Sequence, residues 1–170
     1  MNSYSFFLIL IVGSICGTTP SGACLGDHEN LPGELAIVSS EASSSQSKHP
    51  SANILPGQPG WWYNSDTNLP AWVAASLKSP RKINAIYINF GPGAQRYAID
   101  YEIQFLDART GQWNSWMVLS NNHEEEVLEL LEPMTTSRIR LLIKKTYQPD
   151  RTQRVDEIRL YDLPLETIRD

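Results

Sequence analysis

The sequence predicts an all-β domain, a sandwich or barrel of short strands, that follows a cleaved signal peptide. Apolar and polar side chains alternate strictly in several segments, clusters of turn-forming residues separate these segments, and one unbroken apolar run lies close to the first residue. Alternation with a period of two is typical of half-buried strands. Many short strands separated by regular turns are typical of β-sandwiches and β-barrels.

The apolar run at residues 6–12 predicts the signal peptide. The run is too short to span a bilayer, which takes about 20 apolar residues, and it suits the apolar region of a secretory signal. Pro20 would end a helix there, and Ser21-Gly22-Ala23 offers small residues to a signal peptidase. We therefore predict a signal peptide at 1–23, cleavage after Ala23 and a secreted, extracellular protein. No Lys or Arg precedes the run, so the basic first region of a typical signal peptide is missing. The alternative is an uncleaved membrane anchor.

The length and charge of the chain restrict its partners. A chain of 170 residues suits one domain. The formal net charge of -5 argues against general nucleic-acid binding, which needs a broadly basic face. Removal of the signal peptide would leave one cysteine, Cys24, which cannot form an internal disulfide. Cys24 could link two chains as a disulfide-bonded dimer, carry a small thiol, or remain free.

The strands are predicted where the alternation is clearest. Residues 24–34 have no periodic apolar pattern and predict an N-terminal tail, and the strands begin at Leu35. Residues 124–132 leave two alternatives open, since their Leu and Glu content favours a helix while Pro133 and the neighbouring segments favour a strand. The strands are expected at 73–77, 86–90, 99–105, 139–143 and 158–160, with weaker ones at 117–119 and 127–131.

Turn residues separate these segments and mark the end of the domain. Gly, Pro, Asn and Asp favour turns because each suits or stabilises a turn conformation. The domain is expected to span residues 35–163, followed by a C-terminal tail at 164–170. Turns are predicted at 64–66, 79–80, 91–93, 107–111, 121–122 and 148–150.

The order and spacing of several short motifs resemble one family. The motifs run from a Ser-rich first strand, through Ala52-Asn53-Ile54-Leu55 with Gly57 and Trp62, to a closing Glu157-Ile158-Arg159-Leu160-Tyr161. Between them lie Trp72-Val73-Ala74-Ala75-Ser76-Leu77, Tyr101-Glu102-Ile103-Gln104-Phe105 with Trp113, and Ser137-Arg138-Ile139-Arg140-Leu141. Taken together, residues 35–163 resemble the coagulation factor 5/8 type C family, also called discoidin-like or galactose-binding-like domains.

This resemblance implies a jelly-roll β-sandwich of about eight mainly antiparallel strands. It also implies a recognition module without catalytic activity, which binds its ligand through loops at one end of the sandwich. Many animal members join the two ends of the domain by a disulfide, and this chain lacks that pair of cysteines.

Calcium-containing relatives have a Leu-Asp-Gly motif and a glutamate among their metal ligands. This chain has Leu55-Pro56-Gly57 and Glu157 at the matching positions. Calcium needs several oxygen ligands, and proline offers only its backbone carbonyl. We therefore predict no metal or other cofactor, with a weak calcium site completed by Asp66 as the alternative.

Three loops are expected to meet at the binding end, at residues 56–69, 91–97 and 144–154. Aromatic rings stack on the apolar faces of sugars, and an arginine guanidinium suits hydroxyl pairs, carboxylate, sulfate or phosphate. The alternative for each charged residue is a solvated surface position. The predicted ligand-binding residues are Trp61, Tyr63, Asp66, Arg96, Tyr97, Lys145, Tyr147 and Arg151.

Tryptophans outside this set are expected to pack in the core. Trp62, Trp72 and Trp113 match structural positions of the family, whereas alternation points Trp61 and Tyr63 outward. Replacement of Trp72 by alanine is accordingly predicted to unfold the domain.

The sequence offers no catalytic motif. Nucleophile elbows, phosphate loops and zinc-protease motifs are absent from the sequence, and the acidic run 124–126 beside His123 is expected to face solvent. We therefore predict a secreted, lectin-like module, not an enzyme, that recognises a glycan or glycoconjugate. The alternatives are binding of anionic phospholipid or sulfated polysaccharide at the same loops, and a protein–protein adhesion module in cell adhesion.

Overall fold

A computed structural model describes residues 31–164 of the protein. The predicted signal peptide at 1–23, cleavage after Ala23, Cys24 and residues 165–170 lie outside the described residues. Within residues 31–164 the secondary structure is nine β-strands and one short 3-10 helix, which confirms the all-β prediction. No helix in this part of the chain is long and apolar enough to cross a membrane.

All of the paired strands run antiparallel to one another. Seven strands form one hydrogen-bonded sheet in the order β1-β9-β4-β7-β5-β6, with β2 also paired to β4, and the short strands β3 and β8 form a second sheet. The elements are β1 (Glu34–Leu35), β2 (Ile37–Ala42), η2 (Ser51–Ile54), β3 (Trp62–Tyr63), β4 (Ala71–Asn89), β5 (Ala98–Leu106), β6 (Trp113–Leu119), β7 (Glu126–Thr146), β8 (Arg154–Val155) and β9 (Glu157–Tyr161).

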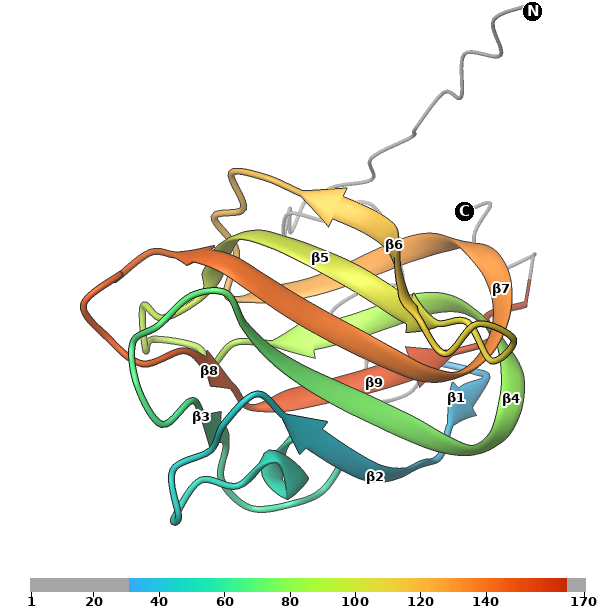
Figure 1. Cartoon of the computed structure of the whole chain (residues 1–170), viewed down its shortest axis with the longest axis horizontal. Coiled ribbons are helices and arrows are strands. Elements are labelled where there is room, and N and C mark those ends of the chain that lie inside the picture. The colour runs from blue at the N-terminus through green and yellow to red at the C-terminus, as the bar shows by residue number, and fades with distance from the viewer. Residues whose placement is uncertain (1–30, 165–170) are drawn as a thin grey trace, which may run out of the picture.

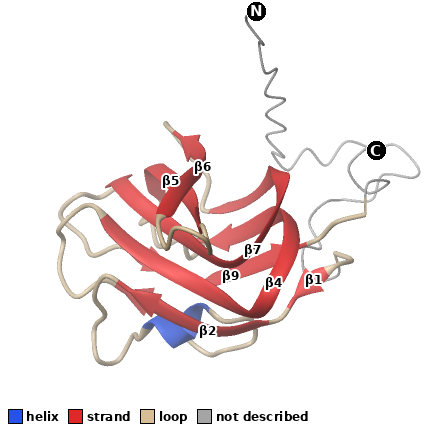
Figure 2. Ribbon diagram, turned by 45° about the vertical axis from the view of Figure 1, so that its right-hand side comes forward, coloured by secondary structure: helices blue, strands red, loops and turns tan. Residues whose placement is uncertain are grey.

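The seven-stranded sheet folds into a two-layered sandwich because β4 and β7 each run through both layers. Residues 71–76 of β4 pair with β2 and with residues 138–143 of β7. Residues 85–89 of β4 pair with β9 and with residues 126–130 of β7. Both strands bend at the right-hand side of Figure 1, and Figure 2 shows the layers from a second direction. The first layer therefore contains β2, β5 and β6, and the second contains β1 and β9.

The predicted turn at Ser79-Pro80 is wrong, because β4 continues through it. The helix considered for 124–132 is also wrong, since β7 covers most of that segment and continues past Pro133. Both prolines lie in the bends, where the register of the described strands gives them no paired residue. A proline is tolerated at such a position because no ladder hydrogen bond from its missing N–H is lost.

The core lies between the two layers and consists of the inward-pointing residue of each alternating pair. Burial of this apolar surface supplies most of the stabilising free energy of such a domain. The buried set on the long strands includes Val73, Ala75, Leu77, Ile86, Ile88, Tyr101, Ile103, Ile139, Leu141, Ile143, Ile158 and Leu160.

Of the three tryptophans expected in the core, only Trp62 is buried there, with an exposed fraction of 0%. Trp72 and Trp113 are half-buried. The Cζ atom of Arg140 lies 5.4 Å from the Trp72 ring centroid and 4.5 Å from the Trp113 ring centroid. Alternation explains the difference: Val73 is buried between the layers, so its neighbour Trp72 faces outward. Loss of the Trp72 ring alone is therefore not expected to unfold the domain, contrary to the prediction from the sequence.

One side-chain hydrogen bond joins the second layer to the first across the core. The Tyr101 hydroxyl donates to Oε1 of Glu129 at 3.0 Å. Burial raises the pKa of the Glu129 carboxyl above its usual value, and the hydrogen bond from Tyr101 offsets this only in part. The Glu129 carboxyl therefore loses its proton at a lower pH in the unfolded chain than in the folded protein. The free energy of unfolding should decrease as the pH rises from the usual carboxyl pKa, about 4.3, to the raised pKa of the folded state.

A Glu129→Gln variant tests this linkage. The amide oxygen can still accept the hydrogen bond from Tyr101, but the group no longer ionises, so the variant should lose less stability than wild type between acid and neutral pH. Urea denaturation from pH 4 to pH 7 measures the difference. Glu132→Gln, which changes an exposed carboxyl on the same strand, serves as the control. Identical pH profiles for wild type and Glu129→Gln would contradict the prediction.

Candidate functional site

Pairing between β3 and β8 brings two of the three predicted loops together. Trp62 pairs with Val155 and Tyr63 pairs with Arg154. Beside them the buried amides of Asn64 and Gln153 are hydrogen-bonded, Nδ2 to Oε1, at 2.9 Å. We call the segments 56–70, 91–97 and 147–156 the tip, which lies at the left-hand end of the sandwich in Figure 1.

Three rings form an aromatic cluster at the base of the tip. The Trp61 ring stacks on His49 with centroids 4.9 Å apart and an interplanar angle of 16°. Tyr63 meets His49 edge-on at 4.7 Å and Trp61 at 5.8 Å. Asn53 on η2 donates through Nδ2 to the Trp61 backbone carbonyl at 3.0 Å. These contacts give the half-buried Trp61 ring protein partners of its own.

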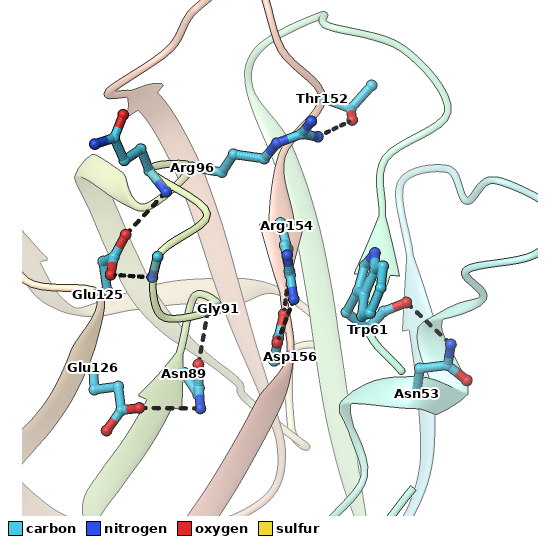
Figure 3. A network of polar contacts seen from close by, with 12 residues as sticks. Asn53, Trp61, Asn89, Gly91, Arg96, Glu125, Glu126, Thr152, Arg154 and Asp156 are labelled. Carbon is cyan, nitrogen blue, oxygen red and sulfur yellow. Dashed lines mark hydrogen bonds and ion pairs between the residues drawn. The ribbon is translucent and has the colours of Figure 1, made fainter. Parts of the chain in front are cut away.

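Beside this cluster an ion pair links the Trp61 ring to the second loop (Figure 3). Arg154 donates through Nε and Nη2 to the two carboxylate oxygens of Asp156, at 2.5 and 2.7 Å, and its Cζ lies 4.2 Å from the Trp61 centroid. Burial alone would lower the pKa of Arg154, but the hydrogen bonds and charge of Asp156 raise it above its usual value. A Cβ on Gly91 would lie 2.5 Å from the Arg154 Nε, and the φ of Gly91 is +86°. Glycine is therefore required where the loop passes this ion pair.

Glu125 fixes the conformation of the 91–97 loop. Its Oε2 accepts the Gly93 N–H at 2.6 Å, and its Oε1 accepts the Gln95 N–H at 2.9 Å. Gln95 has a φ of 51°, in the left-handed region that a non-glycine residue seldom adopts. Glu124 and Glu126 are exposed, as the sequence predicts for the acidic run, whereas Glu125 is half-buried. The carboxylate thus holds the loop that carries Arg96.

Replacement of Glu125 by glutamine should loosen this loop without unfolding the domain. A hydrogen bond to a charged group contributes about 1.5–3 kcal/mol, so exchange of the Gly93 and Gln95 amide protons should accelerate about tenfold or more. Amide hydrogen exchange followed by NMR measures this. Glu124→Gln is the matched control, and the Gly111 amide, which donates to the Asp107 carbonyl at 2.8 Å, is the internal reference. Unchanged exchange at both loop amides would show that Glu125 does not hold them.

Arg96 reaches from its loop across the tip toward the third loop (Figure 3). Its Nη1 donates to the Thr152 hydroxyl at 3.2 Å, and its Cζ lies 4.9 Å from the Tyr63 ring centroid. Its neighbour Tyr97 is buried and stacks on Tyr147 with centroids 5.0 Å apart. Tyr147 is 49% exposed. The tip therefore carries an exposed ring on the loop that adjoins the guanidinium.

The structure thus joins five of the eight predicted residues by direct contact or adjacency, namely Trp61, Tyr63, Arg96, Tyr97 and Tyr147. The other three are exposed. Asp66 shapes its own turn by accepting the Asn68 N–H at 2.8 Å. Lys145 lies in β7, so the third loop begins at 147 and not at 144. Within residues 31–164 no hydrogen bond or ion pair joins Asp66, Lys145 or Arg151 to another predicted residue.

Sequence reasoning missed several residues that build the tip. His49, Glu125 and Asp156 lie outside the three predicted loops, and His49 and Glu125 contact residues that are distant in sequence. Arg154 lies in the predicted third loop, but it is not among the predicted ligand-binding residues. Alternation offered one signal, because Arg154 and Asp156 flank the buried Val155 and so share a face.

The residues matching the family's calcium ligands do not fit a calcium ion. The Glu157 carboxylate accepts a hydrogen bond through Oε1 from Arg159 Nη2 at 3.0 Å, in an ion pair, and Pro56 has no side-chain oxygen. Among the described residues, no group of three or more His, Cys, Asp or Glu side chains lies close enough to hold a metal.

A hollow of about 240 Å³ lies at the bend of β4, away from the tip. It contains neither a carboxylate nor an aromatic ring with which to recognise a ligand. Its lining residues are Leu35, Ala36, Val38, Leu77, Lys78, Ser79 and Arg81. We therefore place the candidate site at the tip.

Comparison with known proteins points to one family. The family model of the F5/8 type C domain matches residues 39–158. No curated protein matches the sequence.

Solved structures share the fold at low sequence identity. Chitosan-binding module 2 of a chitosanase/glucanase from Paenibacillus sp. IK-5, in complex with chitotriose, has a TM-score of 0.66 and 16% identity, covering 75% of this chain and 97% of that one. The family 32 CBM of C. perfringens NanJ, in complex with galactose, has a TM-score of 0.63 and 18% identity, and the match covers 76% of this chain and 99% of that one. The CBM32 of AlyQ, in complex with 4,5-unsaturated mannuronic acid, has a TM-score of 0.63 and 14% identity, and the match covers 76% of this chain and 98% of that one.

Proposed function

The chain belongs to the F5/8 type C domain family, and on that premise we propose that it is a secreted, non-catalytic module that binds carbohydrate at the tip. The structurally similar modules bind chitotriose, galactose and an unsaturated mannuronic acid. Those ligands differ widely in charge, so the fold alone supports carbohydrate as a class and leaves the sugar to the residues of the tip.

The observation that carries this proposal is an exposed Tyr147 ring stacked on Tyr97, whose neighbour in the chain, Arg96, is held in position by Thr152. Tyr147 stacks on the buried Tyr97, which supports one face and leaves the residue 49% exposed. Tyrosine suits sugar binding because its ring packs on the apolar face of a pyranose while polar groups at its rim hydrogen-bond the hydroxyls. Arg96, next to Tyr97, supplies such donors. In this proposal Trp61 supports the site through His49 and Arg154.

Three carboxylates in or beside the tip have structural partners, which supports a binding role over a catalytic one. Glu125 accepts two backbone amides, Asp156 pairs with Arg154, and Asp66 accepts the Asn68 amide. General acid–base catalysis needs a carboxyl group within reach of the reacting atoms and able to exchange its proton. Groups committed to structural hydrogen bonds in this way suit a binding surface. Secretion rests on the predicted signal peptide at 1–23.

A glycan-array screen of residues 24–170 tests the proposal, with Tyr147→Ala beside wild type. Loss of a stacking ring should weaken binding of any glycan found by about 1–2 kcal/mol, or roughly tenfold, while loss of the contact with Tyr97 should lower the melting temperature only slightly and leave the domain folded. Trp113→Ala, which removes a ring on the outer face of the first layer, is the matched control and should bind as wild type does. Binding to no glycan, or equal binding by Tyr147→Ala, would overturn this assignment.

Exposed cations favour a second candidate, binding of an anionic membrane or polysaccharide. Arg151 in the tip and Lys145 near the end of β7 are exposed, and exposed cations attract an anionic surface. Pull-down with phosphatidylserine vesicles across a salt series separates the two candidates. Attraction to vesicles should weaken steeply between about 50 and about 500 mM salt, because exposed charges are screened, whereas a module that binds only glycan should not sediment with the vesicles at any salt concentration.

A further inference from the structure

Two of the three arginines in the tip, Arg96 and Arg154, differ in how their charge is balanced. Arg154 is neutralised by a two-point ion pair with Asp156. Arg96 donates only to the uncharged hydroxyl of Thr152 and lies over the uncharged ring of Tyr63. In the part of the chain that the structure describes, no carboxylate lies within 4.0 Å of the Arg96 guanidinium.

The backbone around Arg96 is held in place before any ligand arrives. Glu125 binds the N–H of the preceding residue, and the following residue, Tyr97, is buried against Tyr147. The Thr152 hydroxyl fixes one edge of the guanidinium. A guanidinium has five N–H donors in a rigid plane, so this single bond leaves most of them for a ligand. A charge already held in position costs less conformational entropy when it binds.

From this geometry we propose that the glycan is acidic, and that its oxyanion pairs with Arg96. The inference rests on the proposed function, which it deepens by naming the ligand class. A carboxylate or a sulfate on a sugar presents two oxygens in the spacing that the guanidinium fork accepts, and such two-point bonds are roughly twice as strong as those to neutral groups. The exposed Lys145 and Arg151 add a positive field that favours the same ligands.

Ligands that differ only in the charged group test the inference by calorimetric titration. A galacturonic acid oligomer supplies carboxylates, its methyl ester keeps the same sugars without charge, and a sulfated galactose oligomer supplies sulfates. Wild-type protein should bind at least one of the two acidic oligomers about tenfold or more tightly than the methyl ester, given the strength of charge-assisted bonds. The stronger of the two identifies the oxyanion.

Variants assign the preference to one guanidinium. Arg96→Gln should bind the acidic oligomer and the methyl ester with similar affinity, and Arg96→Lys, which keeps the charge but not the fork, should keep part of the preference. Arg109→Gln changes an exposed arginine in the turn between β5 and β6 and should behave as wild type. Melting temperatures confirm that each variant is folded.

The possible outcomes separate this inference from the function on which it rests. Equal affinity for acid and ester, a preference that persists in Arg96→Gln, or array binding confined to neutral glycans would overturn the acidic ligand and leave carbohydrate binding standing. Absence of binding to every array glycan and to all three oligomers would overturn both.

Discussion

Replacement of Trp62 by alanine should cost the domain about 3–5 kcal/mol of its free energy of unfolding, the range for truncating a large buried aromatic. The Trp62 side chain is fully buried in the core cluster. Its indole N–H donates to the Ser44 carbonyl at 2.9 Å and lies 3.1 Å from the Ser45 hydroxyl. The truncation leaves a cavity and removes the donor for a part-buried carbonyl. Because a domain of this kind has only about 5–15 kcal/mol of stability, the effect is large.

Urea denaturation at neutral pH measures this loss. Trp113→Ala is the matched control, because its ring is half-buried on the outer face, where it contacts Arg138 and Arg140. Cation–π contacts of this kind contribute about 0.5–1 kcal/mol at exposed sites, so the control should lose much less stability. Equal losses for the two variants would show that burial in the sandwich core does not distinguish these tryptophans.

Replacement of Arg154 by methionine should have the second largest effect, about 2 kcal/mol. Methionine keeps an unbranched apolar side chain but leaves the Asp156 carboxylate without its partner. Breaking a buried ion pair costs about 3–5 kcal/mol, and the side chains of Arg154 and Asp156 are 17% and 21% exposed, so solvent should screen part of that cost. The same change removes the contact with the Trp61 ring, so the aromatic cluster should also become more mobile.

A double-mutant cycle isolates the ion pair. Asp156→Asn alone and Arg154→Met alone should each destabilise the domain, and the double variant should lose less stability than the sum of the two single losses. Strictly additive losses would mean that the two side chains contribute independently. Chemical denaturation of the four proteins supplies the cycle, and the near-ultraviolet circular dichroism of the aromatic cluster reports on Trp61.

Alternation predicted the strands well because each strand has one face in the core. The segment 99–105 illustrates this, since Tyr101 and Ile103 are fully buried while Glu102 between them is more exposed. The same local rule could not show that β4 and β7 cross from one layer to the other. Pro80 and Pro133 predict breaks in an isolated strand, whereas a bent strand accommodates a proline that has no paired residue.

The site was predictable only in part, for a similar reason. The loops that carry Arg96 and Tyr147 could be identified because turn residues mark the ends of strands, and the family resemblance brings these ends together. The partners of Arg96 could not be predicted, because the hydrogen bond to Thr152 and the support of the loop backbone by Glu125 depend on how distant segments approach one another. Trp72 was misassigned because a tryptophan between apolar neighbours looks buried until the direction of each neighbour is known.

The passage of β4 and β7 through both layers has a consequence for how the domain comes apart. In many sandwiches the two sheets are joined only by loops and side-chain packing, so one sheet can fray while the other persists. Here β4 and β7 form backbone hydrogen bonds in both layers. Unfolding of either layer would pull these strands out of the other, so the sandwich should unfold as one cooperative unit, with no intermediate that retains a single intact layer.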